Sequence, residues 1–315
     1  MKNKKNTFVD VSIVIPVYKC NECLIQLCSG ISFDSEKISL KYEIILVDDC
    51  SPDDSWNTIE GIAKEGKSIY GIRLSRNFGQ HIAIVAGLER SIGNRVVVMD
   101  CDLQDDPREI KNLYVKAKEG FHIVYAQRVN RRDPMFKVIM SKVFYKILGY
   151  LTDTRLDASV SNFGIYHRKV IDAVLSMKEG HKIFSIMVRW VGFSSSSIHV
   201  LHASRKYGKS SYSFRNLIKM SIGIVTSFSD KPLRLMIKIG FMVAFISGVY
   251  ALFLIYNGVI NQVDVYGWSS VMVSMWFIGG VLMSIIGVVG LYVGRTFDEV
   301  KSRPVFILDK NTEKF

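Results

Sequence analysis

The chain has 315 residues, and its 41 Lys and Arg residues outnumber 29 Asp and Glu residues, giving a formal net charge of +12. A chain of this length can hold one sizeable α/β domain and a smaller part, and little more. A basic balance fits nucleic acid, an anionic membrane surface or phosphorylated substrates, and two long apolar segments near the carboxyl end favour the last two over nucleic acid.

Apolar runs and amphipathic stretches alternate through the first 130 residues. Five apolar runs predict strands, at 11–17, 42–47, 70–74, 96–99 and 122–126. Four stretches between them predict helices, at 23–31, 55–63, 81–91 and 107–118. This alternation predicts an α/β domain whose mostly parallel, doubly wound sheet is covered on both faces. The first apolar run is too short and too strand-like for a secretory signal.

Polar side chains follow each of these predicted strands. In open α/β sheets the ligand crevice lies outside the carboxyl ends of the strands, so we expect these residues to share one cleft. They are Pro16, Asp48 with Asp49, Arg76 with Asn77, Asp100 with Asp102, and Arg128. A single acid at a strand end is usually a turn or a cap, but a whole rim of polar residues is harder to explain that way.

The segment Asp100-Cys101-Asp102-Leu103-Gln104 predicts a metal site. It follows the apolar run at 95–99, and its two carboxylates and one amide oxygen are hard ligands of the kind that Mg²⁺ and Mn²⁺ prefer. A metal with few protein ligands usually shares its other positions with phosphates, which indicates a nucleoside diphosphate. The alternative is a plain turn at a strand end, since a lone Asp-x-Asp is common by chance.

Two basic amphipathic segments predict helices in the membrane interface. The first covers 135–151, where apolar residues keep a helical stripe for four turns and Lys137, Lys142 and Lys146 lie off it. The second covers 213–230, with Arg215 and Lys219 beside its stripe. An ordinary helix that packs on the sheet would show the same periodicity.

Two uncharged segments, 239–256 and 265–294, approach the roughly 20 residues that a membrane span needs. Lys231, Arg234 and Lys238 precede the first segment and Arg295, Lys301 and Arg303 follow the second, whereas the connector at 257–267 has no Lys or Arg. By the positive-inside rule both ends face the cytoplasm and the connector is external. We therefore expect a multi-pass protein of the inner (cytoplasmic) membrane, with its large domain in the cytosol.

The five cysteines all precede residue 102, in the part expected to be cytosolic, which predicts free thiols. Cys20-x-x-Cys23 resembles half of a zinc or redox site but has no matching second pair. Near the carboxyl end, Gly290-x-x-x-Gly294 with Gly279, Gly280 and Gly287 fits close helix packing, either within one chain or in a homo-oligomer.

Several linked motifs resemble those of the inverting family 2 glycosyltransferases of the polyprenyl-phosphate class, such as dolichyl-phosphate mannose synthase and the bactoprenol glucosyltransferases. They are Ile13-Val-Ile-Pro16-Val-Tyr18, Val47-Asp-Asp-Cys-Ser51, Ser75-Arg-Asn-Phe-Gly79, Asp100-Cys-Asp-Leu-Gln104, Arg205-Lys-Tyr-Gly208-Lys-Ser210-Ser-Tyr212, Thr226-Ser-Phe-Ser229-x-Lys231-Pro-Leu-Arg234 and Gly294-Arg-Thr-Phe-Asp-Glu-Val-Lys-Ser-Arg-Pro304. The resemblance covers residues 11–308 and implies a GT-A fold. The expected parts are a catalytic domain at 1–212, a juxtamembrane helix at 213–230, two membrane helices within 231–294 and a cytosolic tail at 295–315.

The resemblance implies a sugar transfer from a nucleotide-sugar, with UDP-glucose as the first guess, to a polyprenyl (undecaprenyl) phosphate, with Mg²⁺ or Mn²⁺. The implied nucleotide-binding residues are Pro16, Val17, Tyr18, Asp48, Asp49, Arg76, Asp100 and Cys101. The implied metal ligands are Asp100, Asp102 and Gln104. The implied acceptor and phosphate contacts are Arg128, Arg131, Arg132, Arg205, Lys209 and Ser210, and the implied catalytic residues are Asp102, Asp157 and Arg128.

One position departs from the family pattern. Family members often have Gly-Asp-Phe-Arg where this chain has Ser161-Asn162-Phe163-Gly164, so the acid often proposed as a base is an amide here. Asp157 could partly replace it. A lipid monophosphate, whose second pKa is about 6, is mostly dianionic at neutral pH and needs no strong base.

Three other functions fit parts of the sequence. A processive polysaccharide synthase shares the nucleotide motifs but needs more spans, and Ile186 stands where its Gln-x-x-Arg-Trp motif has Gln. A glycoside hydrolase places its two acids on opposite sides of the scissile bond, unlike the neighbouring Asp100 and Asp102. The third is a catalytically silent membrane protein that binds nucleotide.

Overall fold

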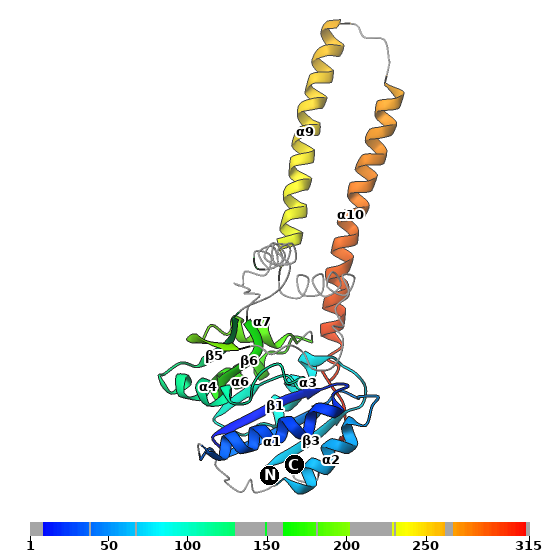
Figure 1. Cartoon of the computed structure of the whole chain (residues 1–315). Coiled ribbons are helices and arrows are strands. Elements are labelled where there is room, and N and C mark those ends of the chain that lie inside the picture. Colours follow the sequence, from blue (N-terminus) through cyan, green and yellow to red (C-terminus); the bar gives the residue numbers. More distant parts are fainter. Residues whose placement is uncertain are drawn as a thin grey trace. The chain divides into compact units, whose positions relative to one another are not determined.

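The computed structural model describes residues 9–37, 39–66, 68–129, 149, 160–180, 182–201, 229, 231–261 and 267–312 (Figure 1). The chain forms two compact units. The first contains Met1–Lys146, Leu156–Ser211 and Arg303–Phe315, and the second contains Ile147–Arg155 and Tyr212–Ser302.

The first unit is built on an eight-stranded sheet with the order β7-β5-β6-β4-β1-β2-β3-β8. Strands β6 and β8 run antiparallel to their neighbours, and the other strands are parallel to one another. The strands are β1 Val11–Val17, β2 Tyr42–Asp48, β3 Ile69–Leu74, β4 Arg95–Val98, β5 Ile123–Val129, β6 Val160–His167, β7 Ser195–Leu201 and β8 Leu308–Asn311. The predicted doubly wound, mostly parallel α/β sheet is thereby confirmed.

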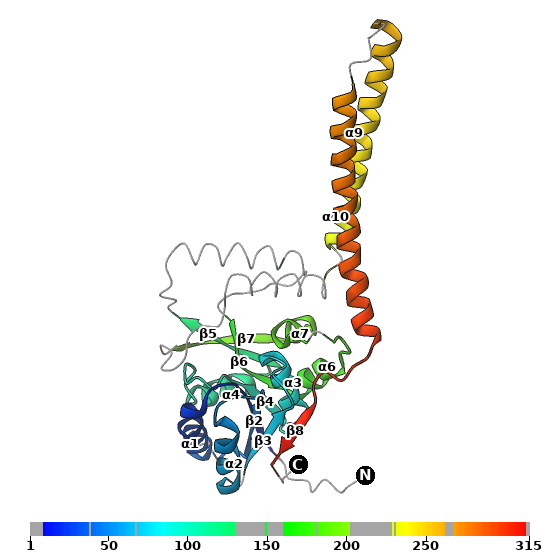
Figure 2. The same ribbon diagram turned by 90° about the vertical axis from the view of Figure 1, so that its right-hand side faces the viewer.

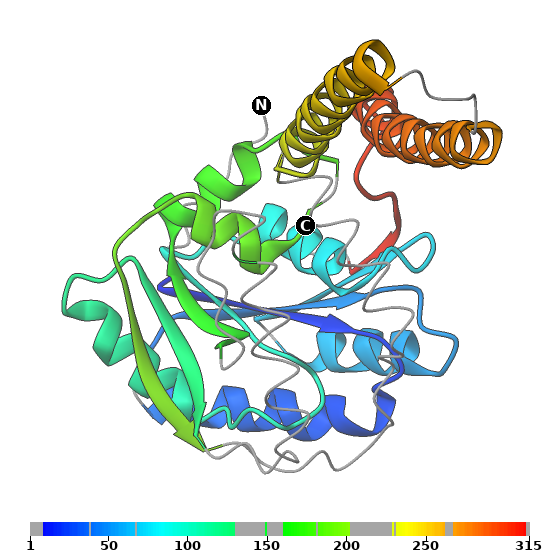
Figure 3. The same cartoon turned by 90° about the horizontal axis from the view of Figure 1, so that it is seen from above.

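Helices cover both faces of this sheet (Figure 3). The helices α1 Asn21–Lys37, α2 Ser55–Glu65 and α4 Glu109–Lys118 pack on one face, and α3 Gln80–Arg90, α6 Arg168–Ser176 and α7 Phe184–Trp190 pack on the other. Alternate residues of β1 serve the two cores: Ile13 and Ile15 lie in the first core and Val14 in the second, all fully buried. Burial on both faces explains why these strands read as continuous apolar runs.

The chain order reverses at β1. From β1 the chain passes through α1, β2 and α2 to β3 on one side, and α3 then leads it back to β4 on the other side of β1. The carboxyl ends of β4, β1, β2 and β3 therefore lie next to one another along one edge of the sheet, on either side of a topological switch point.

All five predicted strands and all four predicted helices of the first 130 residues are present, with ends shifted by a few residues. The strands β6, β7 and β8 and the helices α6 and α7 were not predicted. The predicted helix at 135–151 lies outside the described residues apart from Gly149, and the one at 213–230 lies outside them apart from Ser229.

The second unit contains two long helices, α9 Lys231–Asn261 and α10 Trp268–Val300. Helix α9 continues to Asn261, past residue 256 where the uncharged segment ends. Among the described residues, one stretch is long and apolar enough to cross a membrane: Ser274–Val300 in α10, with a mean hydropathy of 2.1 and no part buried. A second span in α9 stays a prediction.

Candidate active site

The polar residues predicted to share a cleft follow the neighbouring strand ends. Tyr18 comes directly after β1, Asp49 after β2, and Asp100 two residues after the end of β4. Pro16 and Val17 are buried within β1, while Tyr18 is 45 % exposed. A donor that lies along this edge would therefore meet residues from all these strand ends.

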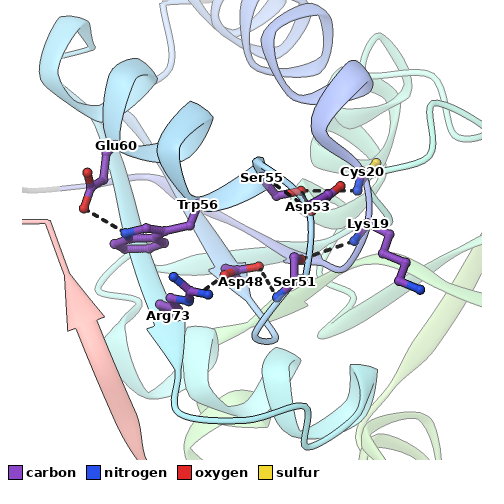
Figure 4. Close-up of polar contacts among 9 residues, drawn as sticks. All are labelled: Lys19, Cys20, Asp48, Ser51, Asp53, Ser55, Trp56, Glu60 and Arg73. Carbon is purple, nitrogen blue, oxygen red and sulfur yellow. Dashed lines mark hydrogen bonds and ion pairs between the residues drawn. The ribbon is translucent and has the colours of Figure 1, made fainter.

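Asp48, the last residue of β2, is fully buried and held on both sides (Figure 4). Its Oδ1 accepts a hydrogen bond of 3.0 Å from the Ser51 backbone N–H, and its Oδ2 lies 3.3 Å from Nε of Arg73. Burial raises the pKa of Asp48, although the bonds from Ser51 and the charge of Arg73 oppose that rise. Arg73, which none of the sequence motifs includes, lies directly opposite Asp48 in the β2–β3 register.

Asp49 braces the loop that follows β3. Its Oδ1 accepts from the backbone N–H of Phe78 at 2.7 Å, and its Oδ2 accepts from that of Gly79 at 2.8 Å. Burial raises the pKa of Asp49, and these two hydrogen bonds oppose the rise. The loop carries Arg76, whose guanidinium lies 4.5 Å from the centre of the Phe78 ring and whose side chain is exposed. Asp49 therefore fixes the loop that presents the exposed Arg76 side chain.

The loop after β1 is tied to the loop after β2. The Lys19 N–H donates to the Ser51 hydroxyl at 3.2 Å, and the Cys20 N–H donates to the Ser55 hydroxyl at 3.4 Å. Figure 4 shows both contacts beside Asp48. These bonds fix the loop that begins at Tyr18 relative to Asp48 and Asp49 at the end of β2.

The Asp-x-Asp segment is held by the side chains of Gln80 and Cys20 and by its own backbone. Gln80, at the start of α3, donates through Nε2 to Oδ1 of Asp100 at 2.6 Å, and the Gln104 N–H donates to Oδ1 of Asp102 at 3.2 Å. The Cys20 thiol, next to the start of α1, donates to the Cys101 carbonyl at 3.0 Å. Contacts with Cys101 and burial raise the pKa of Cys20, so its thiol stays protonated and remains a donor.

Three residues at this edge adopt left-handed backbone conformations that are uncommon outside glycine. Lys19 has φ 55°, Cys50 has φ 53° and Leu103 has φ 57°, and each follows the end of a different strand. Such residues cost of order 1–3 kcal/mol each and tend to cluster at active sites and ligand clamps. Among the described residues of the first unit, one more non-glycine residue, Ser39 before β2, has a positive φ, so most of these costly conformations lie at this edge.

The donor set of this segment fits a divalent cation that is held partly by substrate. Asp100, Asp102 and Gln104 are half-buried and follow one another in a single loop. Within the described residues there is no group of three or more His, Cys, Asp or Glu side chains that could hold a metal by themselves. Mg²⁺ is commonly bound by one or two carboxylates together with phosphates and water, which is the coordination this pair can offer.

Most residues predicted to bind the acceptor lie outside the residues or side chains that the structure describes. Arg128 lies in β5 and its side chain is not among those described, while Arg131, Arg132, Asp157, Arg205, Lys209 and Ser210 lie outside the described residues. Arg73, Gln80 and Cys20 are the site residues that the motifs did not assign. A charge inside the otherwise apolar β3 was the one available sign of Arg73.

Sequence comparison places the chain among known relatives. The family description "Glycosyl transferase family 2" matches residues 12–175. The chain is 32 % identical over 304 residues to a protein named "Uncharacterized glycosyltransferase YkcC" from Bacillus subtilis, covering 96 % of this chain and 94 % of the relative. It is 33 % identical over 301 residues to the undecaprenyl-phosphate 4-deoxy-4-formamido-L-arabinose transferase of Aeromonas hydrophila, covering 95 % and 92 %.

Among solved structures, glucosyl-3-phosphoglycerate synthase from Mycobacterium tuberculosis, in complex with Mn²⁺, UDP and phosphoglyceric acid, matches with a TM-score of 0.47 and 16 % identity, over 70 % of this chain and 77 % of that chain. Because the family description matches more than half of the chain and relatives above 30 % identity are matched over nearly their whole length, the chain belongs to glycosyl transferase family 2.

Proposed function

We propose that this glycosyltransferase moves a sugar from a UDP-sugar to a polyprenyl phosphate, such as undecaprenyl phosphate, at the cytosolic face of the cytoplasmic membrane. The observation that carries the proposal is the Asp100-x-Asp102 pair, which follows β4 at the switch point of the sheet, on the same edge as the buried Asp48 and Asp49. The product is a lipid-linked monosaccharide, which suits the modification of cell-envelope glycans.

The hydrogen-bonding groups around Asp48 favour uracil as the base. Oδ1 of Asp48 accepts from Ser51, so Oδ2 is left as an acceptor beside the guanidinium donors of Arg73. Uracil presents one N–H between two carbonyl oxygens and so matches one acceptor beside a donor. Guanine presents two N–H donors side by side and is matched best by a carboxylate with both oxygens available. We therefore rank UDP-sugars ahead of GDP-mannose.

The acceptor follows from the relatives and from α10. Relatives that match 95 % of this chain are named undecaprenyl-phosphate transferases. The apolar stretch Ser274–Val300 is long enough to hold the enzyme at a bilayer, where an isoprenoid acceptor resides. A basic chain also suits an anionic lipid surface and a phosphorylated acceptor.

The proposed reaction is a single displacement with inversion. The acceptor phosphate oxygen forms a bond to the anomeric carbon while the bond to the nucleoside diphosphate breaks and its electron pair leaves with the diphosphate. Asp100 and Asp102, with Gln104 nearby, would hold Mg²⁺ or Mn²⁺, which when bound neutralises charge on the leaving diphosphate. Arg76, presented by the loop that Asp49 braces, adds positive charge on the same edge of the sheet.

No protein base is needed for this acceptor. Asn162 stands in β6 at the position of the family acid, and its backbone carbonyl accepts a hydrogen bond of 3.1 Å from the Tyr166 hydroxyl. An amide side chain cannot accept a proton at neutral pH. The acceptor phosphate is itself mostly ionised there, since its second pKa is about 6.

Two donors are the leading candidates. UDP-glucose is our first choice, from the motif resemblance. Nucleotide-linked 4-deoxy-4-formamido-L-arabinose is the second, because the named relatives transfer that sugar.

The test uses the purified full-length chain in detergent or nanodiscs with a panel of UDP-sugars, Mn²⁺ and undecaprenyl phosphate, and it measures UDP release and the lipid product. The matched control replaces the lipid phosphate with the free polyprenol, which has the same chain and no nucleophilic phosphate. UDP release that requires the phosphate supports the proposal. UDP binding without turnover on any donor supports the catalytically silent alternative instead.

A further inference from the structure

Strand β8 comes from the segment that follows α10, yet it completes the sheet of the first unit. It pairs antiparallel with β3 at the edge of the sheet, as Figure 2 shows in red. The Thr312 N–H donates to the Gly71 carbonyl at 2.9 Å, and the Gly71 N–H donates to the Thr312 hydroxyl at 3.0 Å. Further along, the Ser75 N–H donates to the Ile307 carbonyl at 2.9 Å. The carboxyl-terminal segment therefore binds the middle of β3, at Gly71, and Ser75, the residue that follows the strand.

One row of paired residues runs across three strands and ends at Asp48. Asp48 in β2 lies opposite Arg73 in β3, and Arg73 lies opposite Lys310 in β8. Residues directly opposite share one face of a sheet, and like charges there repel. Lys310 therefore disfavours any movement of the Arg73 guanidinium toward β8 and favours its contact with Asp48.

The loop that carries Arg76 is held at both ends. The Ile307 carbonyl holds Ser75 before Arg76, and the carboxylate of Asp49 holds Phe78 and Gly79 after it. Without the bond to Ile307, Asp49 would hold that loop from one side only. The position of Arg76 thus depends on a segment more than 200 residues away in the sequence.

We propose that β8 is the positioning element of the donor site, which holds β3 and the loop at 75–79 so that Arg73 and Arg76 meet the nucleotide. The proposal rests on the proposed function for the identity of the nucleotide. It assigns to the segment after α10 a role in donor binding, beyond attachment of the chain to a membrane.

The exposure of β8 makes this role testable without loss of the fold. Asp309, Lys310 and Asn311 are exposed, and Leu308 is only partly buried, so the strand adds little to the core. Substitutions in it should change the placement of β3 more than the stability of the first unit.

The first test compares Thr312→Pro with Thr312→Ser in the full-length chain. Proline removes both the N–H and the hydroxyl that Thr312 offers to Gly71, whereas serine keeps both. We expect Thr312→Pro to speed amide hydrogen exchange at Gly71 and to raise the Kd for UDP about tenfold, the size expected when hydrogen bonds of ordinary strength are lost. The kcat and the KM for lipid should stay within about twofold of wild type, and Thr312→Ser should behave like wild type.

The second test compares Lys310→Glu with Lys310→Arg. Glutamate gives Arg73 a second carboxylate on the same face, and we expect a rise of about threefold in the Kd for UDP, as for a cross-strand charge pair. Arginine keeps the repulsion and should leave the Kd unchanged. These surface substitutions leave the core untouched.

Two results would overturn the proposal. One is an unchanged Kd for UDP in Thr312→Pro although exchange at Gly71 has become faster. The other is a parallel fall of kcat, donor affinity, lipid affinity and thermal midpoint, which indicates a merely structural strand. If wild type binds GDP and not UDP, the donor in the proposed function is wrong, and the same ratio of affinities measured with GDP still decides the role of β8.

Discussion

Replacement of Asp49 by Asn tests whether this acid braces the Arg76 loop or contacts the nucleotide. Both of its oxygens accept backbone N–H groups, from Phe78 at 2.7 Å and Gly79 at 2.8 Å, and the residue is 2 % exposed. Asparagine keeps one acceptor oxygen and turns an NH₂ group toward the other N–H. One buried donor is then left without an acceptor.

The expected cost follows from two opposing effects. A buried donor without its acceptor costs about 1–3 kcal/mol. Burial raises the pKa of Asp49, which means that its hydrogen bonds do not fully offset the free-energy cost of burying the ionised carboxylate. Replacing the carboxylate with a neutral amide recovers part of that desolvation cost. We therefore expect a net loss near the lower end, about 1 kcal/mol, which corresponds to about a fivefold larger population of the displaced loop.

The assay is amide hydrogen exchange at Phe78 and Gly79 without nucleotide, together with the Kd for UDP. The matched control is Asp106→Asn, which also neutralises an acid but breaks an exposed ion pair whose Asp106 and Arg108 side chains are 35 % and 78 % exposed. That pair should contribute less than about 1 kcal/mol. Unchanged exchange at Phe78 and Gly79 combined with weaker UDP binding would refute the bracing role and indicate direct contact with the nucleotide.

Three further predictions follow from the same edge of the sheet. Asp102→Asn should lower kcat at least about 100-fold while membrane insertion is retained, and chelation of divalent cations should lower it similarly. The assay is lipid-dependent UDP release, and near-normal activity in either case contradicts the metal assignment. Cys20→Ala should weaken Mn²⁺ activation several-fold because the Cys101 carbonyl loses its donor, whereas Cys20→Ser should retain it; equal loss in both indicates packing alone. Burial raises the pKa of Asp48, so the Kd for UDP should rise with falling pH earlier than for an ordinary Asp. Folding stability depends on pH in the opposite direction, because the contribution of Asp48 is present below its unfolded pKa and lost as pH rises through its folded pKa. Asp48→Asn should reduce the pH dependence of both UDP affinity and stability.

The local signals in the sequence were enough for the first half of the sheet. Strands β1 to β5 are apolar runs because both of their faces are buried, and that property is visible residue by residue. The acids that follow them are therefore placed correctly at the carboxyl edge. The Asp-x-Asp segment and the pair Asp48 and Asp49 needed no information beyond order and periodicity.

Long-range pairings account for what the sequence did not reveal. Strand β8 reads Leu-Asp-Lys-Asn, a polar segment that becomes a strand only by pairing with β3. Asp49 gave no sign that its partners would be Phe78 and Gly79, about 30 residues ahead. The Cys20-x-x-Cys23 pattern resembles half of a zinc or redox site, yet all five cysteines are free and the Cys20 thiol donates to the Cys101 carbonyl.

Strand β8 also limits how often the chain can traverse a bilayer. It is hydrogen-bonded into the same sheet as strands that precede α9, and one sheet cannot occupy two sides of a membrane at once. If the chain crosses a membrane between Ser211 and Arg303, it must return to the side that holds the sheet before Arg303. The number of membrane crossings in this interval is therefore even. If α10 makes one passage, another must occur in the same interval, and α9 is the other long helix in the described part of it.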